Sequence, residues 1–151
     1  AGMDKLALVP QFAPDLILRN DEPEKVIEAV RKETDGIGAD IVICAVPVAK
    51  PQQQALEMVR KRGKVVIYGG VSKNNPMTTL NSNLIHYNEI TVVGAFSYPA
   101  TGLEKALRFI REGVVSAAKY VTKIVSLDHV VDGMRYSREG KALKIVIKPW
   151  E

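Results

Sequence analysis

Residues 34–71 have the sequence TDGIGADIVICAVPVAKPQQQALEMVRKRGKVVIYGGV. Within this stretch, residues 39–46 (ADIVICAV) are a continuous apolar run apart from Asp40, which is typical of a strand covered on both faces. An amphipathic helical pattern begins at Pro51, and residues 64–70 then form a second apolar strand. The alternation of strand, helix and strand predicts an α/β fold built from a right-handed βαβ unit with parallel strands.

The helix that begins at Pro51 is expected to run as far as Gly63, because glycine commonly ends helices. The basic residues 60–62 would then face the negative pole of that helix. The positions that recur at helical spacing are Ala55, Met58, Val59 and Arg62.

Segments on either side continue the alternation. Residues 15–20 are a short apolar run that we interpret as a strand, and a helix with acidic residues near its start follows from Pro23 and stops at Gly36. Residues 72–87 are polar and rich in turn residues, which predicts a long loop that could serve as a lid. Residues 90–96 form the next predicted strand.

The last part of the chain begins with a helix, where Thr101 and Glu104 have the spacing of a capping box. Residues 120–125 and 142–148 are prone to form strands, and Ser126 is placed to cap a short helix between them. These two strands can belong to a different sheet.

Composition limits the classes of partner. The 151 residues, 46% of them hydrophobic, suit one globular domain, and a net charge of +4 spread over the sequence argues against a nucleic-acid surface. No run approaches the roughly 18 apolar residues of a membrane helix, so no membrane partner is expected. The single cysteine, Cys44, excludes a disulfide framework and is typical of a reducing, cytoplasmic setting.

Gly36 and Gly38 could be mistaken for the start of a GxGxxG phosphate loop. That loop must follow a strand and open a helix, so that backbone amides point at a pyrophosphate. Here the glycines follow a helix and open a strand, and Ile41 stands where the third glycine should be. We therefore interpret this segment as a tight turn.

Small residues follow each of the later predicted strands. In open parallel sheets, ligands bind beyond the carboxyl ends of strands, and small residues let a flat ring approach the main chain. Ordinary turns need the same residue types, so the residues alone leave the two interpretations about equal. The strand ends are residues 45–47, 69–71 and 94–97.

A resemblance favours the ligand site. Residues 15–149 resemble the C-terminal half of the medium-chain dehydrogenases, the family of zinc-dependent alcohol, polyol and threonine dehydrogenases. The resemblance rests on four segments in the family's order and spacing: TDGIGADIVICAV, GKVVIYGGV, NLIHYNEITVVGAFSYP and SLDHVVDGMRYSREGKALKIVIKP.

The resemblance implies a Rossmann-like α/β fold, a mostly parallel sheet with flanking helices, which binds NAD or NADP. Carried over by position, the implied cofactor-binding residues are Val46 at the adenosine end or nearby ribose, Tyr68, Gly69, Gly70 and Val71 along the nicotinamide half, Ala95, Phe96 and Ser97 around the carboxamide, and Lys144 at the pyrophosphate.

The resemblance also divides the chain. Residues 1–14 would be a cloning remnant and lead-in, residues 15–119 a partial dinucleotide-binding domain, and residues 120–151 a helix and strand that return toward a catalytic domain. The family's glycine fingerprint and its Cys, His and Glu zinc ligands have no counterpart here, so the fold is expected to be truncated at its N-terminal side. No catalytic residue and no metal ligand is assigned to this chain.

The implied parent enzyme transfers a hydride between an alcohol or polyol and a nicotinamide cofactor, with zinc held by residues that this chain lacks. We expect no turnover and, at best, weak cofactor binding from this chain alone. The zinc-free quinone reductase branch of the same superfamily is one alternative. A non-catalytic assembly or binding module is another.

Truncation predicts exposed sheet edges and therefore a homo-oligomer. Either residues 15–20 pair directly with residues 39–46, or elements are exchanged with a second copy. The predicted strand at residues 90–96 is the edge through which relatives often dimerise.

Overall fold

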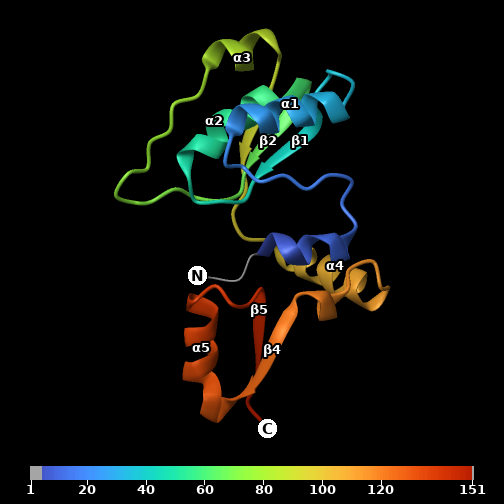
Figure 1. Cartoon of the computed structure of the whole chain (residues 1–151), viewed down its shortest axis with the longest axis vertical. Coiled ribbons are helices and arrows are strands. Elements are labelled where there is room, and N and C mark those ends of the chain that lie inside the picture. The colour runs from blue at the N-terminus through green and yellow to red at the C-terminus, as the bar shows by residue number, and fades with distance from the viewer. Residues whose placement is uncertain (1–4, 151) are drawn as a thin grey trace. The chain divides into compact units, whose positions relative to one another are not determined.

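The computed structural model describes residues 5–150, and the chain falls into two units (Figure 1). One unit is residues 18–97, and the other combines residues 5–17 with residues 98–150. Residues 1–4, which belong to the predicted cloning remnant, lie outside the described residues. Each unit has its own sheet and is described by itself.

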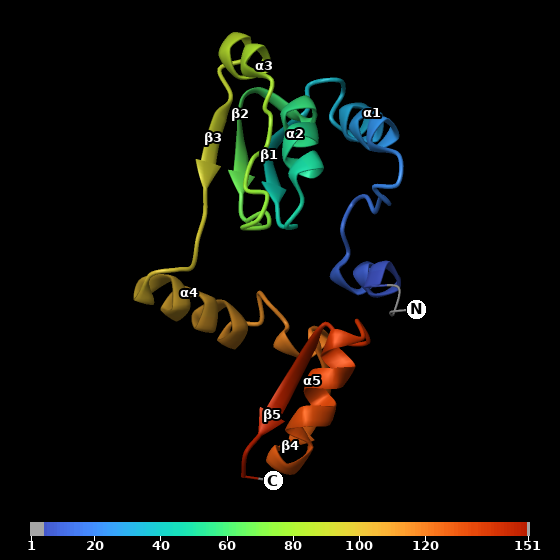
Figure 2. The ribbon, with the colours of Figure 1, turned by 90° about the vertical axis from the view of Figure 1, so that its left-hand side faces the viewer.

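The first unit holds a parallel sheet whose strand order is β1-β2-β3. Figure 2 shows the three strands side by side with their arrows pointing the same way. Their bounds are Ala39–Cys44 for β1, Val59–Ile67 for β2 and Thr91–Gly94 for β3. The predicted α/β fold with parallel strands is therefore confirmed.

Helix α1 (Pro23–Glu33) precedes β1, and helix α2 (Ala49–Met58) connects β1 to β2. The core of this unit lies where α2 meets the sheet, and its fully buried side chains are Leu56, Val59 and Val65. The apolar spacing that predicted α2 converges on this core, and so do Val42 and Cys44 of β1. Ile41 and Ile43 of β1 are 57% and 62% exposed, so the expectation that this strand is covered on both faces is wrong.

The turn that joins α1 to β1 is as tight as the glycines predicted. Gly38 has φ +98°, and a Cβ there would lie 2.7 Å from the carbonyl oxygen of Met58. The Gly38 amide donates a hydrogen bond of 2.9 Å to the hydroxyl of Thr34. Only glycine fits this position, because both the backbone angle and the space forbid a side chain.

The predicted end of the second helix at Gly63 is wrong. The helix ends at Met58, and Val59 already has extended angles of φ −75° and ψ 146°. Residues 60–63 bulge out of β2 instead, since Ala39 pairs with Val59 but Ile41 pairs with Lys64. The basic residues 60–62 therefore lie in this bulge of β2, and they are not the last turn of α2.

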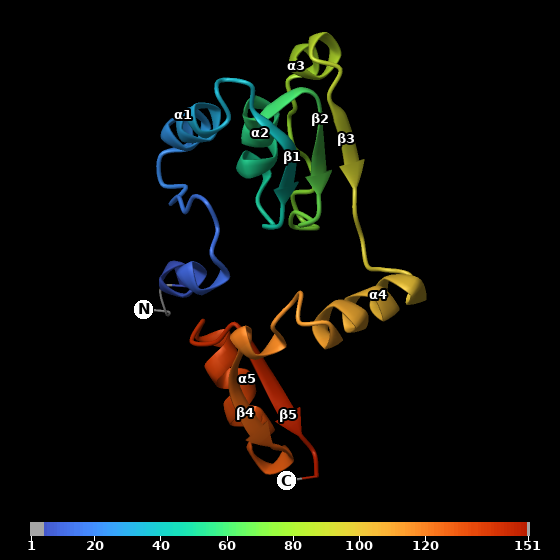
Figure 3. The same ribbon diagram turned by 90° about the vertical axis from the view of Figure 1, so that its right-hand side faces the viewer.

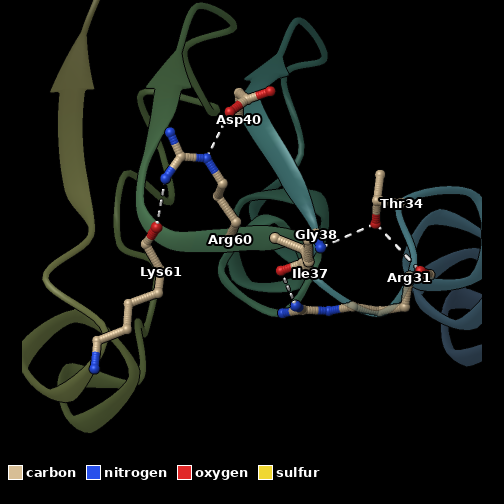
Figure 4. Close-up of polar contacts among 7 residues, drawn as sticks. All are labelled: Arg31, Thr34, Ile37, Gly38, Asp40, Arg60 and Lys61. Carbon is tan, nitrogen blue, oxygen red and sulfur yellow. Dashed lines mark hydrogen bonds and ion pairs between the residues drawn. The ribbon is translucent and has the colours of Figure 1, made fainter.

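Arg31 supplies a physical reason for this early end. Its guanidinium donates to the Glu57 carbonyl at 2.7 and 3.0 Å and to the Val59 carbonyl at 3.2 Å, and so satisfies carbonyls at the close of the helix. The same group donates to the Ile37 carbonyl at 2.6 Å, and Figure 4 shows it beside the Gly38 turn. Asp40 pairs with Arg60 on the neighbouring bulge.

The prediction of a strand at residues 15–20 is also wrong. These residues have no strand structure, and the side chains of Leu16, Ile17 and Leu18 are exposed. Asn20 instead exchanges hydrogen bonds with Gln54 of α2 at 2.9 and 3.0 Å. Direct pairing of this segment with β1, one of the two predicted consequences of truncation, does not occur.

The excursion at residues 72–87 is only partly a loop. It contains a short helix, α3 (Ser82–Tyr87), whose first amides are capped by the side chain of Asn81. Leu84 and Ile85 of this helix pack against the core. Figure 3 shows α3 at the end of the sheet opposite the arrowheads, so this part of the segment does not lie over the carboxyl ends of the strands.

The second unit holds a parallel pair, β4 and β5, which confirms the prediction of a separate sheet (Figure 3). Its helices are α4, α5 and three 3-10 turns. The bounds are Lys5–Phe12 for η1, Ala100–Arg111 for α4, Ala117–Lys119 for η2, Val121–Ser126 for β4, Leu127–His129 for η3, Val130–Arg138 for α5 and Lys144–Lys148 for β5.

Both predicted side-chain caps of this unit are wrong. Pro99 is the N-cap of α4, so Thr101 is already inside the helix and cannot cap it. Ser126 does precede a helical turn, but its hydroxyl contacts the ring Nδ1 of His129 at 2.9 Å and bonds no backbone amide of that turn. Across residues 5–150, no helix has the length and apolar character needed to cross a membrane.

Candidate functional site

The carboxyl ends of β1, β2 and β3 are joined by backbone hydrogen bonds. The amides of Tyr68 and Gly69 both donate to the Cys44 carbonyl, at 3.1 and 2.7 Å. The amide of Ala95 donates to the Ile67 carbonyl at 3.0 Å. These bonds hold the predicted residues Tyr68, Gly69 and Ala95 at one edge of one sheet.

Gly69 packs directly on the backbone of Val46. A Cβ at Gly69 would lie 2.5 Å from the Val46 carbonyl oxygen and 2.7 Å from its nitrogen, which no real side chain tolerates. Gly70 differs, because nothing lies within 4 Å of the position its Cβ would take. The first glycine therefore locks two strand ends together, and the second leaves an open backbone surface.

The side chains at this edge are exposed, and several are apolar or aromatic. Val46 is 44% exposed, Tyr68 62% and Phe96 99%. Val71 is half-buried, and Ser97 has φ +58°, a left-handed conformation that turns the chain sharply after β3. Exposed rings and open backbone at the carboxyl ends of parallel strands are the features that suit a flat ligand.

Lys144 is the one predicted site residue that belongs to the second unit. It begins β5, in the second unit and in the other sheet. There it lines a cavity of about 240 Å³ between α5 and β5, together with Gly133, Met134 and Ser137.

Gln52 is a residue of this site that the sequence analysis missed. It lies on α2, is 3% exposed, and donates from Nε2 to the Gly69 carbonyl at 3.2 Å. A signal was present, because Gln52 precedes Ala55 by three positions and Val59 by seven, which puts an amide on the apolar face of a helix. A buried amide on such a face needs a hydrogen-bond partner.

Cys44, a titratable residue, ends β1 at this edge. Cys44 is buried, and burial raises the pKa of its thiol, which keeps it protonated and unreactive as the sequence indicated. Among residues 5–150, no group of three or more His, Cys, Asp and Glu side chains is arranged to hold a metal ion. The described residues therefore do not fit a zinc ion.

These features define a Rossmann-like α/β fold with a candidate ligand edge at the carboxyl ends of its strands. The chain belongs to the family described as zinc-binding dehydrogenase, which matches residues 2–112. The resemblance seen in the sequence is thereby confirmed.

Individual relatives agree with the family. The chain is 33% identical over 125 residues to the sorbitol dehydrogenase of Halalkalibacterium halodurans, covering 81% of this chain and 35% of that protein. It is 33% identical over 129 residues to alcohol dehydrogenase 2 of Caenorhabditis elegans, covering 84% and 34% respectively. The chain thus spans about a third of the length of the curated relatives it matches.

Solved structures share the fold. The 2R,3R-butanediol dehydrogenase of Bacillus subtilis aligns with a TM-score of 0.80 at 24% identity, covering 95% of this chain and 40% of that one. A short chain alcohol dehydrogenase of Escherichia coli CFT073, solved as a complex with its cofactor NADH, aligns with a TM-score of 0.81 at 15% identity, covering 98% and 43%.

The strand-end edge fits the nicotinamide half of a dinucleotide. Gly70 presents open backbone, and Tyr68 and Phe96, which follow β2 and β3, have exposed rings. A loop for the diphosphate is not among the described residues, because the Gly36 and Gly38 turn follows α1 and opens β1.

Proposed function

We propose that this chain supplies the nicotinamide side of the cofactor site of an NAD(P)-dependent dehydrogenase that oxidises an alcohol or polyol. The observation that carries the proposal is the joined carboxyl edge of β1, β2 and β3, where Gly69 packs on Val46 and Gly70 is open. When bound, the nicotinamide supplies the hydride chemistry, and the protein contributes position and exclusion of water.

The relatives support the substrate class. Their names include sorbitol, alcohol and butanediol dehydrogenases, and one neighbour is a complex with NADH. The proposed cofactor contacts are those implied by the sequence: Val46, Tyr68, Gly69, Gly70, Val71, Ala95, Phe96, Ser97 and Lys144. Because the chain spans about a third of the relatives' length, we expect weak cofactor binding and no turnover from this chain alone.

The remaining parts of the proposal concern the setting of the chain. We propose a cytoplasmic location, supported by one free and buried cysteine. We also propose a homo-oligomer formed through sheet edges, and a division at residue 119 between the cofactor domain and a C-terminal segment.

Calorimetric titration of the chain with NADH and with NADPH tests the proposal. We expect one of the two to bind and Gly70→Glu to weaken that binding at least about tenfold, because the new carboxylate fills the open edge and repels the cofactor phosphates. Asn83→Glu, an identical addition of charge on the exposed surface of α3 at the opposite end of the sheet, is the control. Absence of binding by either cofactor, or equal effects of the two variants, would contradict the proposal.

A further inference from the structure

Gln52 is a buried amide whose bond reaches the ligand edge. Its side chain is 3% exposed and lies on α2, in the βαβ unit that links β1 to β2. A buried amide without a hydrogen-bond partner costs free energy, so the folded chain favours the conformation in which Gln52 makes its hydrogen bond. The partner it has is the Gly69 carbonyl, at 3.2 Å and 17 residues away.

With this bond, both backbone polar groups of Gly69 are hydrogen-bonded within the protein. The Gly69 amide already donates to the Cys44 carbonyl at 2.7 Å, and its Cα packs on the backbone of Val46. With the carbonyl held by Gln52, both polar groups of this residue have partners inside the protein. The peptide that joins Gly69 to Gly70 therefore has one preferred orientation.

That orientation has a consequence for Gly70. In a trans peptide the carbonyl and the following amide point in opposite directions, and there are no cis peptides in the described chain. Since the Gly69 carbonyl points toward α2, the Gly70 amide points away from α2. In the described part of the chain this amide has no hydrogen-bond partner, and the surface around Gly70 is open.

Gln54 shows what a purely structural glutamine on the same helix does. It is 4% exposed, and it bonds Asn20 and the Pro23 carbonyl, at the start of α1 and away from the strand ends. The two glutamines are equally buried and differ in what they hold. One fixes a helix start, and the other fixes the peptide at the ligand edge.

We propose that Gln52 is a positioning residue for the nicotinamide cofactor. It acts through Gly69 and orients the Gly70 amide as a donor to an oxygen acceptor on the nicotinamide half, a ribose hydroxyl or the carboxamide oxygen. The inference rests on the proposed function, since it assumes that a nicotinamide cofactor occupies this edge. Free rotation of the Gly69 to Gly70 peptide would turn this donor away from the ligand.

The test compares Gln52→Met with Gln54→Met by NADH calorimetry and urea unfolding. Methionine keeps the length of the side chain and removes the donor in both variants. We expect Gln52→Met to weaken NADH binding about fivefold to tenfold, the value of one directed hydrogen bond. Gln54→Met should lower stability at least as much and leave the dissociation constant within about twofold.

The outcomes separate the two proposals. If the unaltered chain binds neither NADH nor NADPH, the proposed function fails and the inference fails with it. If the unaltered chain binds NADH or NADPH and Gln52→Met binds the same cofactor equally well, only the inference is overturned. Parallel losses of binding and stability in both glutamine variants would also overturn it, because that is the behaviour of two structural residues.

A second measurement decides the matter if Gln52→Met does not fold. In amide NMR spectra of the unaltered 16.6 kDa chain, the Gly70 cross-peak should move downfield on saturation with NADH, since its proton gains an acceptor. The Gly113 amide, which donates to the Ile110 carbonyl in the other unit, is the internal reference. An unmoved Gly70 peak at saturation overturns the inference.

Discussion

The backbone around Gly69 leaves no room for a side chain. The stability of a Gly69→Ala variant therefore tests this packing. Gly69→Ala would force a Cβ to within 2.5 Å of the Val46 carbonyl oxygen, and backbone on both sides must move. We expect a loss of about 1 to 3 kcal/mol in the free energy of unfolding, measured with urea. Gly70→Ala, where nothing lies within 4 Å, should change stability by less than about 0.5 kcal/mol.

The ion pair between Arg62 and Glu89 makes a prediction about pH. Their side chains lie 2.9 Å apart, and the hydrogen bond from Arg62, followed by its charge, lowers the pKa of the Glu89 carboxyl. A lowered pKa contributes stability above the unfolded-state value, near 4.3, and that contribution is lost as pH falls through the folded value. Both side chains are exposed, so the effect on stability is small and the pKa itself is the better observable.

Carboxyl NMR titration can measure this pKa. We expect Arg62→Ala to return the pKa of Glu89 toward the ordinary glutamate value, and high salt to do so in part. Glu139, whose pKa is lowered by Lys141, should keep its value in the same variant. Unchanged titration of Glu89 in Arg62→Ala would show that the pair does not form in solution.

At the scale of the element, Arg31 bonds carbonyl groups at the end of α2. Its guanidinium donates to the carbonyls of Glu57 and Val59 at the end of α2. It also donates to the Ile37 carbonyl in the turn before β1 (Figure 4), and so joins the two segments. We expect Arg31→Met to lower the free energy of unfolding by about 2 kcal/mol, since carbonyls held by a charged donor lose it. Urea unfolding measures the change.

Lys32→Met is the matched control, because it removes the same charge from an exposed neighbour on the same helix. It should change stability by less than about 0.5 kcal/mol. Arg31→Lys should recover only part of the loss, because lysine keeps the charge but not the planar set of donors. Equal losses in Arg31→Met and Lys32→Met would mean that charge, and not the carbonyl contacts, stabilises α2.

The same contact explains why this boundary could not be predicted from sequence. Apolar spacing continues past Met58, and Gly63 is a natural stop, so a local pattern extends the helix too far. The actual end depends on a side chain 26 residues earlier in the chain. The strand prediction for residues 15–20 is wrong for a related reason, because an apolar run becomes a strand only where a neighbouring strand can pair with it.

At the scale of the whole molecule, the fold class was predictable and part of the site was not. Continuous apolar strands alternating with amphipathic helices leave few arrangements besides a parallel α/β sheet, and strand ends then fall on one edge by geometry. The contact of Gln52 with Gly69 joins two elements through a single side chain. Such contacts follow from three-dimensional packing and leave only a weak trace in sequence, here one amide on an apolar helix face.

The proposed assembly through sheet edges can be tested at β3, which has no partner strand on its outer side within the described residues. The Ala95 amide points to β2, where it bonds the Ile67 carbonyl, so the preceding amide, that of Gly94, points to the open edge. Gly94→Pro removes this outward donor without removing a side chain, and proline is tolerated on edge strands.

We expect sedimentation of the unaltered chain to depend on concentration, because an unpaired edge strand pairs with a second copy. In a symmetric pair Gly94→Pro removes one donor from each copy, and self-association should weaken about tenfold or more. Gly94→Ala keeps the amide and adds a Cβ where nothing lies within 4 Å, so it should associate like the unaltered chain. If the chain sediments as a monomer at every concentration, or if Gly94→Pro associates normally, the contact does not run through β3.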